Sequence, residues 1–380
     1  MDSFYTEQQK ILSQTARDFS LTELAPKSSE IDDNEHFPIE QFQALSNLGF
    51  TGLTIDSKFG GEDGNYVDMM VVIEEIAAVC GSTSTVLITH VSLASQTINR
   101  FGNEHQKSHW LPDLSKGKKI AAFSLSEPQN GSDALGLNTN IEKIDEKNYI
   151  LNGNKIFTTN GEVADVFIVF CTSNKQAGYK GVTALIVDKN TEGLSIIPQH
   201  GKMGMRGSST AEIVFNNCKI PTENRLLNEG DGYSIALKIL DSSRIMIAAQ
   251  CVGIAKGSLN AAINYSKQRQ TFNKPISQHQ SIAFTLADMA TELDASRLMT
   301  WRAARLHDEK LSYSKEAAMA KLYSSEVSGR IVNKALQIHG GTGYFKPSIV
   351  ERMYRDQRVT EIYEGTSEIQ RLVISRSLLN

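Results

Sequence analysis

The 380-residue chain is poor in cysteine, proline and tryptophan, with 4, 8 and 2 of each. None of the cysteines forms a CxxC pair, and each lies in or beside an apolar stretch: Cys80, Cys171, Cys218 and Cys251. This pattern argues against a disulfide framework and is typical of buried free thiols in a reducing compartment. No apolar run reaches the length of a membrane span, and the first residues are polar and acidic, unlike a secretory signal. We therefore expect a cytoplasmic protein outside the membrane.

An excess of positive charge is also missing. The chain has 39 basic and 43 acidic residues, a formal net charge of −4, whereas general nucleic-acid binding needs a basic field. Rossmann, P-loop, GxSxG and HExxH motifs are absent from the sequence. His105 and His109 stand four apart without a third ligand, so we expect no metal. With 40% hydrophobic residues, the chain can bury large cores in two or three domains.

The most informative stretch lies near the C-terminus, at residues 358–370. Glu364 precedes Gly365, which can adopt positive φ and lets a substrate approach the backbone. Ser367 and Gln370 have the spacing of a capping box, so a helix is predicted to begin there. A carboxylate on a turn just outside a helix is placed like a catalytic base. On this local pattern alone, however, a satisfied turn is the commoner outcome.

Residues 1–118 are predicted to be helical. Residues 66–80 are almost continuously apolar apart from Glu74 and Glu75, which predicts a buried helix. Residues 85–98 are predicted to form another apolar helix. The glycine-rich residues 60–64 lack a strand–turn–helix frame, so we expect a plain loop there.

Strand-like runs replace the helical spacing between Ile120 and about residue 228. The runs are 120–126, 149–151, 155–159, 165–171, 182–187 and 211–215. Asn152 and Gly153 separate two of them, and this dipeptide predicts a β-hairpin turn. The region is therefore expected to be a small antiparallel β domain.

Long helices are predicted again after residue 228, at 232–268, 282–307 and 315–339. Asp241 and Arg244 interrupt the apolar face of the first, and such a pair is usually a structural ion pair. Arg269 ends the same helix. An arginine there can interact with the helix dipole, or it can hold a phosphate with its guanidinium fork.

Five motifs together resemble the acyl-CoA dehydrogenase family, and the resemblance runs from about residue 1 to residue 380. The motifs are YEGTSEIQ at 363–370, LSEPQNGSD at 125–133, NGNKIFTTNG at 152–161, MGMRGSST at 203–210 and QIHGGTGY at 337–344. Two positions depart from the usual pattern, because Phe157 replaces a common tryptophan and Asn130 replaces a small residue. We interpret Arg206 as structural, bracing a domain interface.

The resemblance implies an α+β fold that is mostly α. It has an N-terminal helical domain at 1–118, a middle antiparallel β domain at 119–228 and a C-terminal four-helix-bundle-like domain at 229–380. In this family the residue matching Glu364 removes the α-proton of an acyl-CoA thioester while the β-hydride passes to FAD. The family's other position for the base is here Ser243, which cannot act without a base of its own. Substrate contacts are implied for Ser132, Asp241, Arg244, Tyr363 and Gly365.

The same resemblance implies that FAD is held by two groups of residues from two subunits. We call the first the flavin set: Phe123, Leu125, Ser126, Gly131, Ser132, Phe157 and Thr159. We call the second the partner set: Arg269, Thr271, Phe272, His279, Gln280, Gln337, Gly340 and Gly341. Thr366 and Glu368 are further implied contacts with FAD. A homotetramer built as a dimer of dimers is implied, with electron-transferring flavoprotein as the electron acceptor.

Three helical segments look most like the short-chain, butyryl-CoA type members: 286–290, 297–304 and 315–322. We therefore expect saturated acyl-CoAs of about four or five carbons and a role in fatty acid β-oxidation. The predicted helix 85–98 contains no arginine to pair with a second carboxylate, which disfavours glutaryl-type substrates. The alternatives are a short branched-chain dehydrogenase, a dehydrogenase of carrier-protein-bound acyl groups, a flavin oxidase and a non-catalytic flavoprotein.

Overall fold

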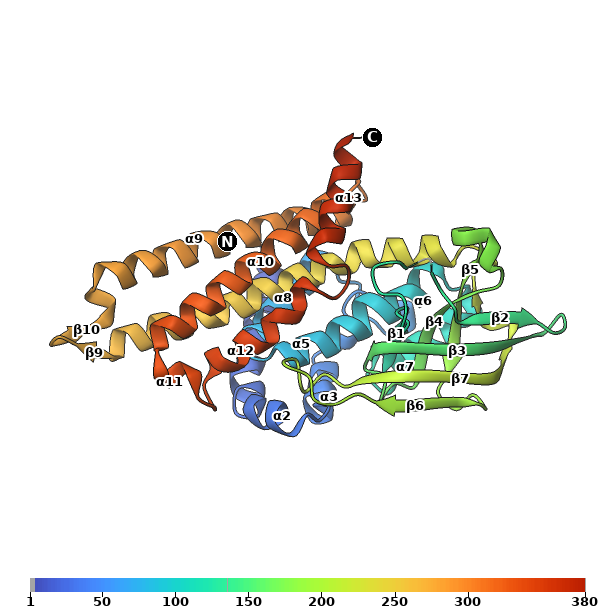
Figure 1. Ribbon diagram of the computed structural model, residues 1–380, viewed down its shortest axis with the longest axis horizontal. Coiled ribbons are helices and arrows are strands. Elements are labelled where there is room, and N and C mark those ends of the chain that lie inside the picture. Colours follow the sequence, from blue (N-terminus) through green and yellow to red (C-terminus); the bar gives the residue numbers. More distant parts are fainter. Residues whose placement is uncertain (1–3, 135, 380) are drawn as a thin grey trace.

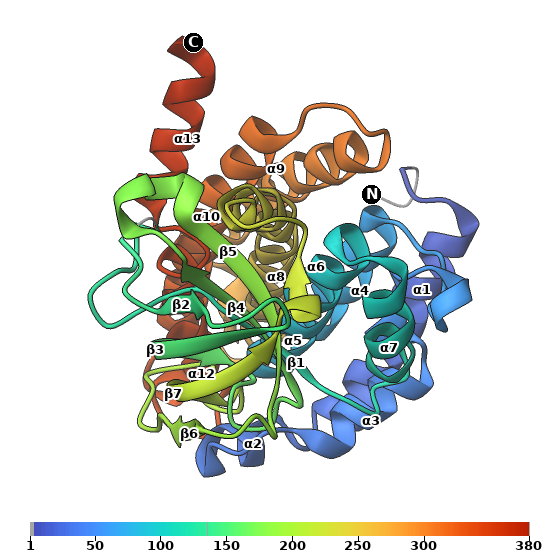
Figure 2. The same cartoon turned by 90° about the vertical axis from the view of Figure 1, so that its right-hand side faces the viewer.

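The structure is a computed structural model and describes residues 4–134 and 136–379. Helices around a buried pair, α4 and α5, make up the N-terminal part (Figures 1 and 2). The main helices are α1 Glu7–Phe19, α2 Ser28–Asn34, α3 Ile39–Asn47, α4 Tyr66–Ala77, α5 Gly81–Ile88, α6 Gln96–Phe101 and α7 Glu104–Ser115. Every residue of α4 is buried, as predicted for 66–80. Its two carboxylates are paired, Glu74 with Arg297 at 2.9 Å and Glu75 with Lys256 at 2.7 Å.

The apolar helix predicted at 85–98 is not one regular α-helix. It consists of the end of α5, a π-helical segment at Thr89–Ser95 and the start of α6. A π-helical segment widens the helix and often marks a functional site. Within it, the Ser92 hydroxyl lies 3.2 Å from the hydroxyl of Ser243. The apolar pattern did not predict this change in winding, because every residue of Thr89–Ser95 is buried and no polar face marks the period of the helix.

An eight-stranded sheet forms the middle of the chain. Its strands are β1 Ala121–Ser124, β2 Asn140–Lys143, β3 Asn148–Thr159, β4 Val166–Thr172, β5 Val182–Asp188, β6 Leu194–Pro198, β7 Thr210–Pro221 and β8 Arg225–Leu226. The order is β6-β7-β3-β2-β4-β5-β8, with β1 paired to β4. The sheet is mixed rather than antiparallel. Strand β1 runs parallel to β4, and β2 also pairs with β4 in parallel, at one pair of residues. Strand-like runs predict strands but not their partners, and β1 and β4 are separated in the sequence by β2 and β3.

The predicted hairpin at Asn152–Gly153 is wrong. Strand β3 runs unbroken from Asn148 to Thr159, and its register against β7 shifts between Leu151 and Gly153. The glycine has φ 133°, and a Cβ there would lie 2.6 Å from the Cα of Thr139. An Asn-Gly pair therefore serves here as a bulge where two backbones approach closely.

Three long helices form the C-terminal part: α8 Gly232–Gln268, α9 Gln280–Asp308 and α10 Ser314–His339. The sequence predicted each of them to within two residues. The 37 residues of α8 make a rod about 55 Å long that packs against α4, α9 and α10. The remaining elements are β9 Gln270–Thr271, β10 Lys274–Pro275, α11 Gly341–Tyr344, α12 Ile349–Gln357 and α13 Ser367–Leu379. Figures 1 and 2 show α13 projecting away from the rest of the molecule. Within the described ranges, every helix is too short or too polar to cross a membrane.

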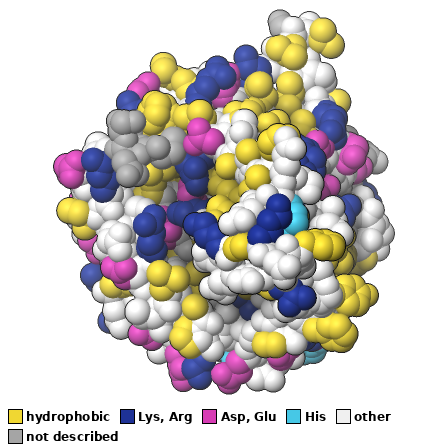
Figure 3. Space-filling view, turned by 90° about the vertical axis from the view of Figure 1, so that its left-hand side faces the viewer, with side chains coloured by type: hydrophobic (Ala, Val, Ile, Leu, Met, Phe, Trp, Pro, Cys, Tyr) yellow, Lys and Arg dark blue, Asp and Glu magenta, His cyan; other side chains and the backbone are white. Residues whose placement is uncertain are grey.

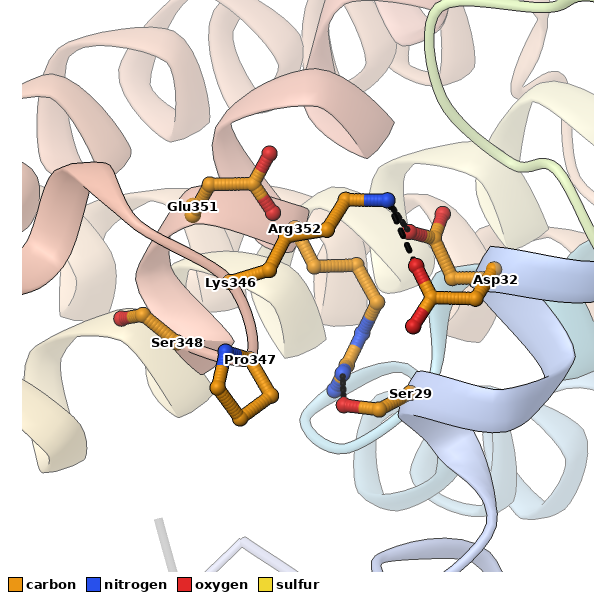
Figure 4. A pocket seen from close by; sticks show the side chains of 8 residues that line it. Ser29, Asp32, Lys346, Pro347, Ser348, Glu351 and Arg352 are labelled. Atoms are coloured by element: carbon orange, nitrogen blue, oxygen red, sulfur yellow. Dashed lines mark hydrogen bonds and ion pairs between the residues drawn. The ribbon is translucent and has the colours of Figure 1, made fainter.

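A buried carboxylate, Asp32 on α2, joins distant parts of the chain. It accepts hydrogen bonds from both terminal nitrogens of Arg355 on α12, at 2.6 and 2.9 Å. Figure 4 shows Lys346 reaching across the same junction, with its Nζ 3.6 Å from Asp32. Arg206, from the loop before β7, donates to the Asp32 carbonyl at 2.9 Å and pairs with Glu35 at 2.7 Å. This is the bracing role that the sequence suggested for Arg206.

Candidate active site

Glu364 and Gly365 form a tight turn between a 3₁₀ segment at Arg358–Glu361 and the start of α13. Both residues have positive φ, 51° for Glu364 and 94° for Gly365. The positive φ predicted for Gly365 is therefore confirmed, and a Cβ there would lie 2.7 Å from the side-chain nitrogen of Gln370. A glutamate in this conformation is strained by about 1–2 kcal/mol, so the surrounding contacts must hold it in place.

The capping box predicted at Ser367 and Gln370 does not form. Thr366 caps α13 instead, accepting from the backbone N–H of Ile369 at 3.4 Å. The Ser367 hydroxyl has no hydrogen-bond partner among the described residues. The side chain of Gln370 turns away from a capping role and donates to the carbonyls of Gly365 at 2.8 Å and Glu364 at 3.2 Å. The cap therefore forms one residue earlier than predicted, and the glutamine holds the turn.

The carboxyl group of Glu364 is buried and incompletely bonded. Its Oε2 has no hydrogen-bond partner in the described part of the chain. Burial raises the pKa of Glu364 to about 7, against the lowering effects of Ser243, Lys321 and Arg244. A carboxylate with this pKa is well suited to take up a proton near neutral pH.

A buried polar network fixes Tyr363, the residue before Glu364. The Tyr363 hydroxyl donates to the side-chain oxygen of Gln250 on α8. The amide nitrogen of Gln250 donates in turn to Ser84 at 2.8 Å and to Thr85 at 2.7 Å. The sequence analysis did not identify Gln250. The only sequence feature that could have indicated it is a single amide side chain within the apolar stretch of α8.

Arg244 connects α8 to the turn. Its Nη1 donates to Asp241 at 2.5 Å, which is the ion pair that the sequence predicted. Its Nε lies 3.5 Å from the carbonyl oxygen of Glu364. The structure therefore brings Asp241, Arg244, Tyr363, Glu364 and Gly365 together, and all five were predicted site residues.

The flavin set lies on the sheet and offers an apolar surface edged by hydroxyl groups. Phe157 on β3 is 67% exposed at φ 54°, next to a second register shift. Phe123 on β1 is half-buried, with its ring 4.8 Å from that of Phe170. Leu125, Ser126 and Thr159 are half-buried. An uncovered aromatic ring beside hydroxyl groups fits one face and the polar edge of a flavin.

The turn that carries Gly131 and Ser132 is held by a buried ion pair that sequence reasoning missed. Lys155 on β3 bonds Glu127 at 2.7 Å, and both side chains are almost wholly buried. The same ammonium donates to the Leu125 carbonyl at 3.0 Å. Gly131 and Ser132 are exposed beyond this anchor, where they are free to meet a ligand. The sequence feature that could have indicated this ion pair is a lysine, Lys155, at an inward-facing position of a strand.

The partner set lies at the opposite end of the molecule from the sheet, beyond the C-terminal end of α8 (Figure 1). The β9–β10 hairpin presents Phe272, which is 89% exposed, and the Thr271 hydroxyl lies 3.2 Å from His279 Nε2. Arg269 is exposed beside them. The other members are also exposed: Gln280, Gln337, Gly340 and Gly341. Figure 3 shows hydrophobic side chains mixed with Lys and Arg on this end. One chain thus does not gather both sets, whereas Thr366 and Glu368 lie close to Glu364 in sequence, at the start of α13.

Comparisons with known proteins cover almost the whole chain. Three family descriptions match: "Acyl-CoA dehydrogenase, N-terminal domain" at residues 6–118, the middle domain at 122–218 and the C-terminal domain at 230–379. A short-chain specific acyl-CoA dehydrogenase of Clostridium acetobutylicum is 41% identical over 375 residues, with 99% of each chain covered. The caffeyl-CoA reductase–Etf complex subunit CarC of Acetobacterium woodii is 41% identical over 377 residues, again with 99% of each covered.

Solved structures agree with these sequence matches. Butyryl-CoA dehydrogenase from Megasphaera elsdenii superposes with a TM-score of 0.97 at 40% identity and covers 99% of both chains. An acyl-CoA dehydrogenase from Bacillus anthracis complexed with FAD gives 0.93 at 32% identity, covering 99% of this chain and 67% of that one. The motifs, the fold and the comparisons therefore agree that the chain belongs to the acyl-CoA dehydrogenase family.

Proposed function

We propose that the protein oxidises short-chain acyl-CoA thioesters to trans-2-enoyl-CoA, with Glu364 as the base. The observation that carries this proposal is the buried Glu364 carboxyl, which has an unpaired oxygen and a pKa raised to about 7 by burial. A non-catalytic flavoprotein would have no use for a strained, buried carboxyl group with one unpaired oxygen at this place. The matches to short-chain and butyryl-CoA dehydrogenases support the substrate class.

The residues of the turn supply the proton chemistry. Glu364 Oε2 accepts the proton from the α-carbon, and the C–H electron pair forms the new double bond. The backbone N–H of Glu364 stabilises the thioester oxygen as charge develops, a contact whose loss typically costs about 10²–10³ in rate. FAD, when bound, accepts the hydride from the β-carbon. Asp241, Arg244, Tyr363 and Gly365 border the thioester.

We further propose that each FAD is held between two subunits of a homotetramer. The flavin set and Thr366 come from one subunit and the partner set from its neighbour, because one chain keeps the two sets at opposite ends. The Bacillus anthracis relative complexed with FAD supports the choice of cofactor. The Arg269 guanidinium would hold the pyrophosphate as a fixed fork. Arg269→Ala should lose FAD and loosen assembly together, and a variant that keeps its full flavin content would refute this contact.

Electron-transferring flavoprotein is the proposed acceptor, which the Etf complex named for the Acetobacterium woodii relative supports. Slow reoxidation of the reduced protein in air would distinguish it from an oxidase. Proton and hydride transfers are microscopically reversible, so the same residues could also catalyse reduction of an enoyl-CoA. The reduction potential of the flavin decides whether the enzyme oxidises or reduces its substrate. The buried free cysteines fit the proposed cytoplasmic role in fatty acid β-oxidation.

The substrate is tested by anaerobic titration with acyl-CoAs of graded length and branching. We expect the flavin absorbance to bleach fastest with butyryl-CoA or with branched chains of four or five carbons. Glu364→Gln serves as the matched control, because it retains the pocket and removes the base. Faster bleaching with octanoyl- or palmitoyl-CoA would overturn the short-chain assignment, and bleaching by an acyl carrier protein thioester alone would favour that alternative.

A further inference from the structure

Two lysines of the described chain are completely buried, and they differ in what their ammonium groups contact. Lys155 pairs with the carboxylate of Glu127. Lys321, on α10, instead donates to the backbone carbonyl of Gly365 at 2.7 Å. Among the residues that the structure describes, no carboxylate oxygen lies within ion-pair distance of Lys321. A buried ammonium without a carboxylate partner is energetically unfavourable, and an apolar residue of similar size would pack there more favourably.

The carbonyl that Lys321 contacts belongs to the strained turn of the base. Gly365 follows Glu364 directly, and both have positive φ. The carbonyl oxygen of Gly365 accepts a second hydrogen bond, from the side-chain nitrogen of Gln370 at 2.8 Å. Lys321 from α10 and Gln370 from α13 therefore hold one carbonyl from two sides. Because this peptide group sets the orientation of the turn, holding it restrains the direction of the Glu364 side chain.

We propose that Lys321 is a positioning residue for the base: its ammonium clamps the Gly365 carbonyl and so fixes where Glu364 points. The proposal deepens the proposed function and rests on Glu364 being the base. A base displaced by about 1 Å typically loses about 10²-fold in rate, so a single clamp of this kind matters for catalysis.

The charge of Lys321 adds a second, separable effect. The titratable and charged groups around it are Cys251 and Arg244 on α8, and Glu361 and Glu364 before α13. Glu361 is already paired with Arg358 at 3.1 Å. Burial lowers the pKa of Lys321 to about 8, so it remains mainly protonated at neutral pH. Its positive charge in turn lowers the pKa of Glu364.

Lys321→Met is the decisive variant, because methionine keeps an unbranched side chain only one atom shorter and removes the charge and the donor. In the FAD-loaded enzyme, with saturating butyryl-CoA, the rate of flavin reduction should fall about 10- to 100-fold. The pH midpoint of that rate should move upward, since the cation near Glu364 is gone. The melting temperature should stay the same or rise, because a buried charge has been replaced by an apolar group.

Two further variants separate positioning from packing. Gln370→Met removes the other donor without changing charge, so the rate should fall while the pH midpoint stays in place. Because both donors act on one carbonyl, the effects of Lys321→Met and Gln370→Met should not be additive. Lys315→Met, on the same helix but 35% exposed, should leave rate, midpoint and flavin content unchanged.

A Lys321→Met enzyme that reduces its flavin at the normal rate and with the normal midpoint would overturn the proposal. A lower melting temperature with a normal rate per bound flavin would likewise assign Lys321 to packing alone. If Lys321→Met fails to fold, Gln370→Met still tests the clamp, and a normal rate there would refute it. Failure of the proposed function would be seen separately, as normal flavin reduction by Glu364→Gln.

Discussion

At the scale of single residues, two opposing influences set the pKa of Glu364, the proposed base. Burial disfavours the ionised carboxylate, while Ser243, Lys321 and Arg244 favour it. The outcome, a pKa of about 7, leaves the group able both to take a proton and to give it up near neutral pH. A glutamate on the surface would be ionised but too weak a base for a thioester α-proton.

Glu364→Gln should nearly abolish flavin reduction while leaving FAD content and ligand binding intact. The amide keeps the shape and most hydrogen bonds of the side chain but cannot accept the proton, so the rate should fall by about 10²–10⁴ or more. Stopped-flow flavin reduction and the bound-flavin absorbance measure the two properties separately. Adding Ser243→Glu should restore part of the rate, since Ser243 faces the same carboxyl. Normal reduction by the single variant would contradict the assignment of the base.

The rate of flavin reduction should depend on pH with a midpoint near 7. Below it Glu364 is protonated, so the rate should fall about tenfold per pH unit, and above it the rate should level off. The folded-state pKa is raised above its ordinary value of 4.5, so Glu364 lowers folding stability progressively as pH rises from 4.5 to about 7. Glu364→Gln should therefore gain stability over the parent across that range and show no gain below it. A midpoint near 4.5 would indicate a solvated carboxylate.

At the scale of elements, the sequence predicted the long helices well and the local exceptions poorly. Helices α8, α9 and α10 follow from sustained apolar spacing. Three local features could not be predicted from the sequence: the bulge at Gly153, the π-helical segment before α6 and the Thr366 cap. The first two depend on neighbours distant in sequence, and the third depends on which of two adjacent hydroxyl groups caps the helix. Likewise, the site residues within motifs were predicted, whereas Lys321 and Gln250 were not. Their contacts with the turn cross 44 and 113 residues of chain.

Gly153→Ala should destabilise the sheet more than a glycine substitution without close neighbours. The new Cβ would lie 2.6 Å from the backbone of Thr139, adding overpacking of about 1–3 kcal/mol to the strain of positive φ. Gly201→Ala is the matched control, because Gly201 also has positive φ, 80°, and no atom outside its own stretch of backbone lies within 4 Å of the place that its Cβ would take. It should lose only about 1–2 kcal/mol. Urea unfolding measures both, and equal losses would show that the approach of Thr139 is unimportant.

At the scale of the whole molecule, Asp32 ties the N-terminal helices to α12 and to the loop before β7. The division at residues 118 and 228 remains a prediction, which limited proteolysis can test. The pKa of Asp32 is lowered: burial raises it, but the hydrogen bonds and charge of Arg355 outweigh burial. Its contribution to stability is therefore present above the ordinary value of 3.8 and is lost as pH falls through the lowered value.

Asp32→Asn should destabilise the protein by about 1–3 kcal/mol, since it weakens the buried charge-assisted hydrogen bonds with Arg355. The basic groups keep other carboxylate partners in Glu351, Glu35 and Asp33, which limits the loss. Asp33→Asn is the control, because Asp33 is 48% exposed and its 2.6 Å pair with Lys346 faces solvent. That pair should contribute at most about 1 kcal/mol. Thermal unfolding compares the two, and similar losses would show that the junction is no stronger than a surface pair.

Helix α8 begins against β5, passes the turn of Glu364 at Arg244 and ends at the β9–β10 hairpin. A single unbroken helix of this kind fixes the distance between its two ends. It fixes equally firmly the rotation about the helix axis that relates a side chain at one end to a side chain at the other. One residue inserted or deleted between Arg244 and Gln268 would rotate everything downstream by about 100° and would turn Arg269 to another side of the molecule. A side-chain substitution in α8 leaves this geometry in place and a change of its length does not, whereas the exposed turn at Lys175–Gly181 can grow or shrink without disturbing either end of the site.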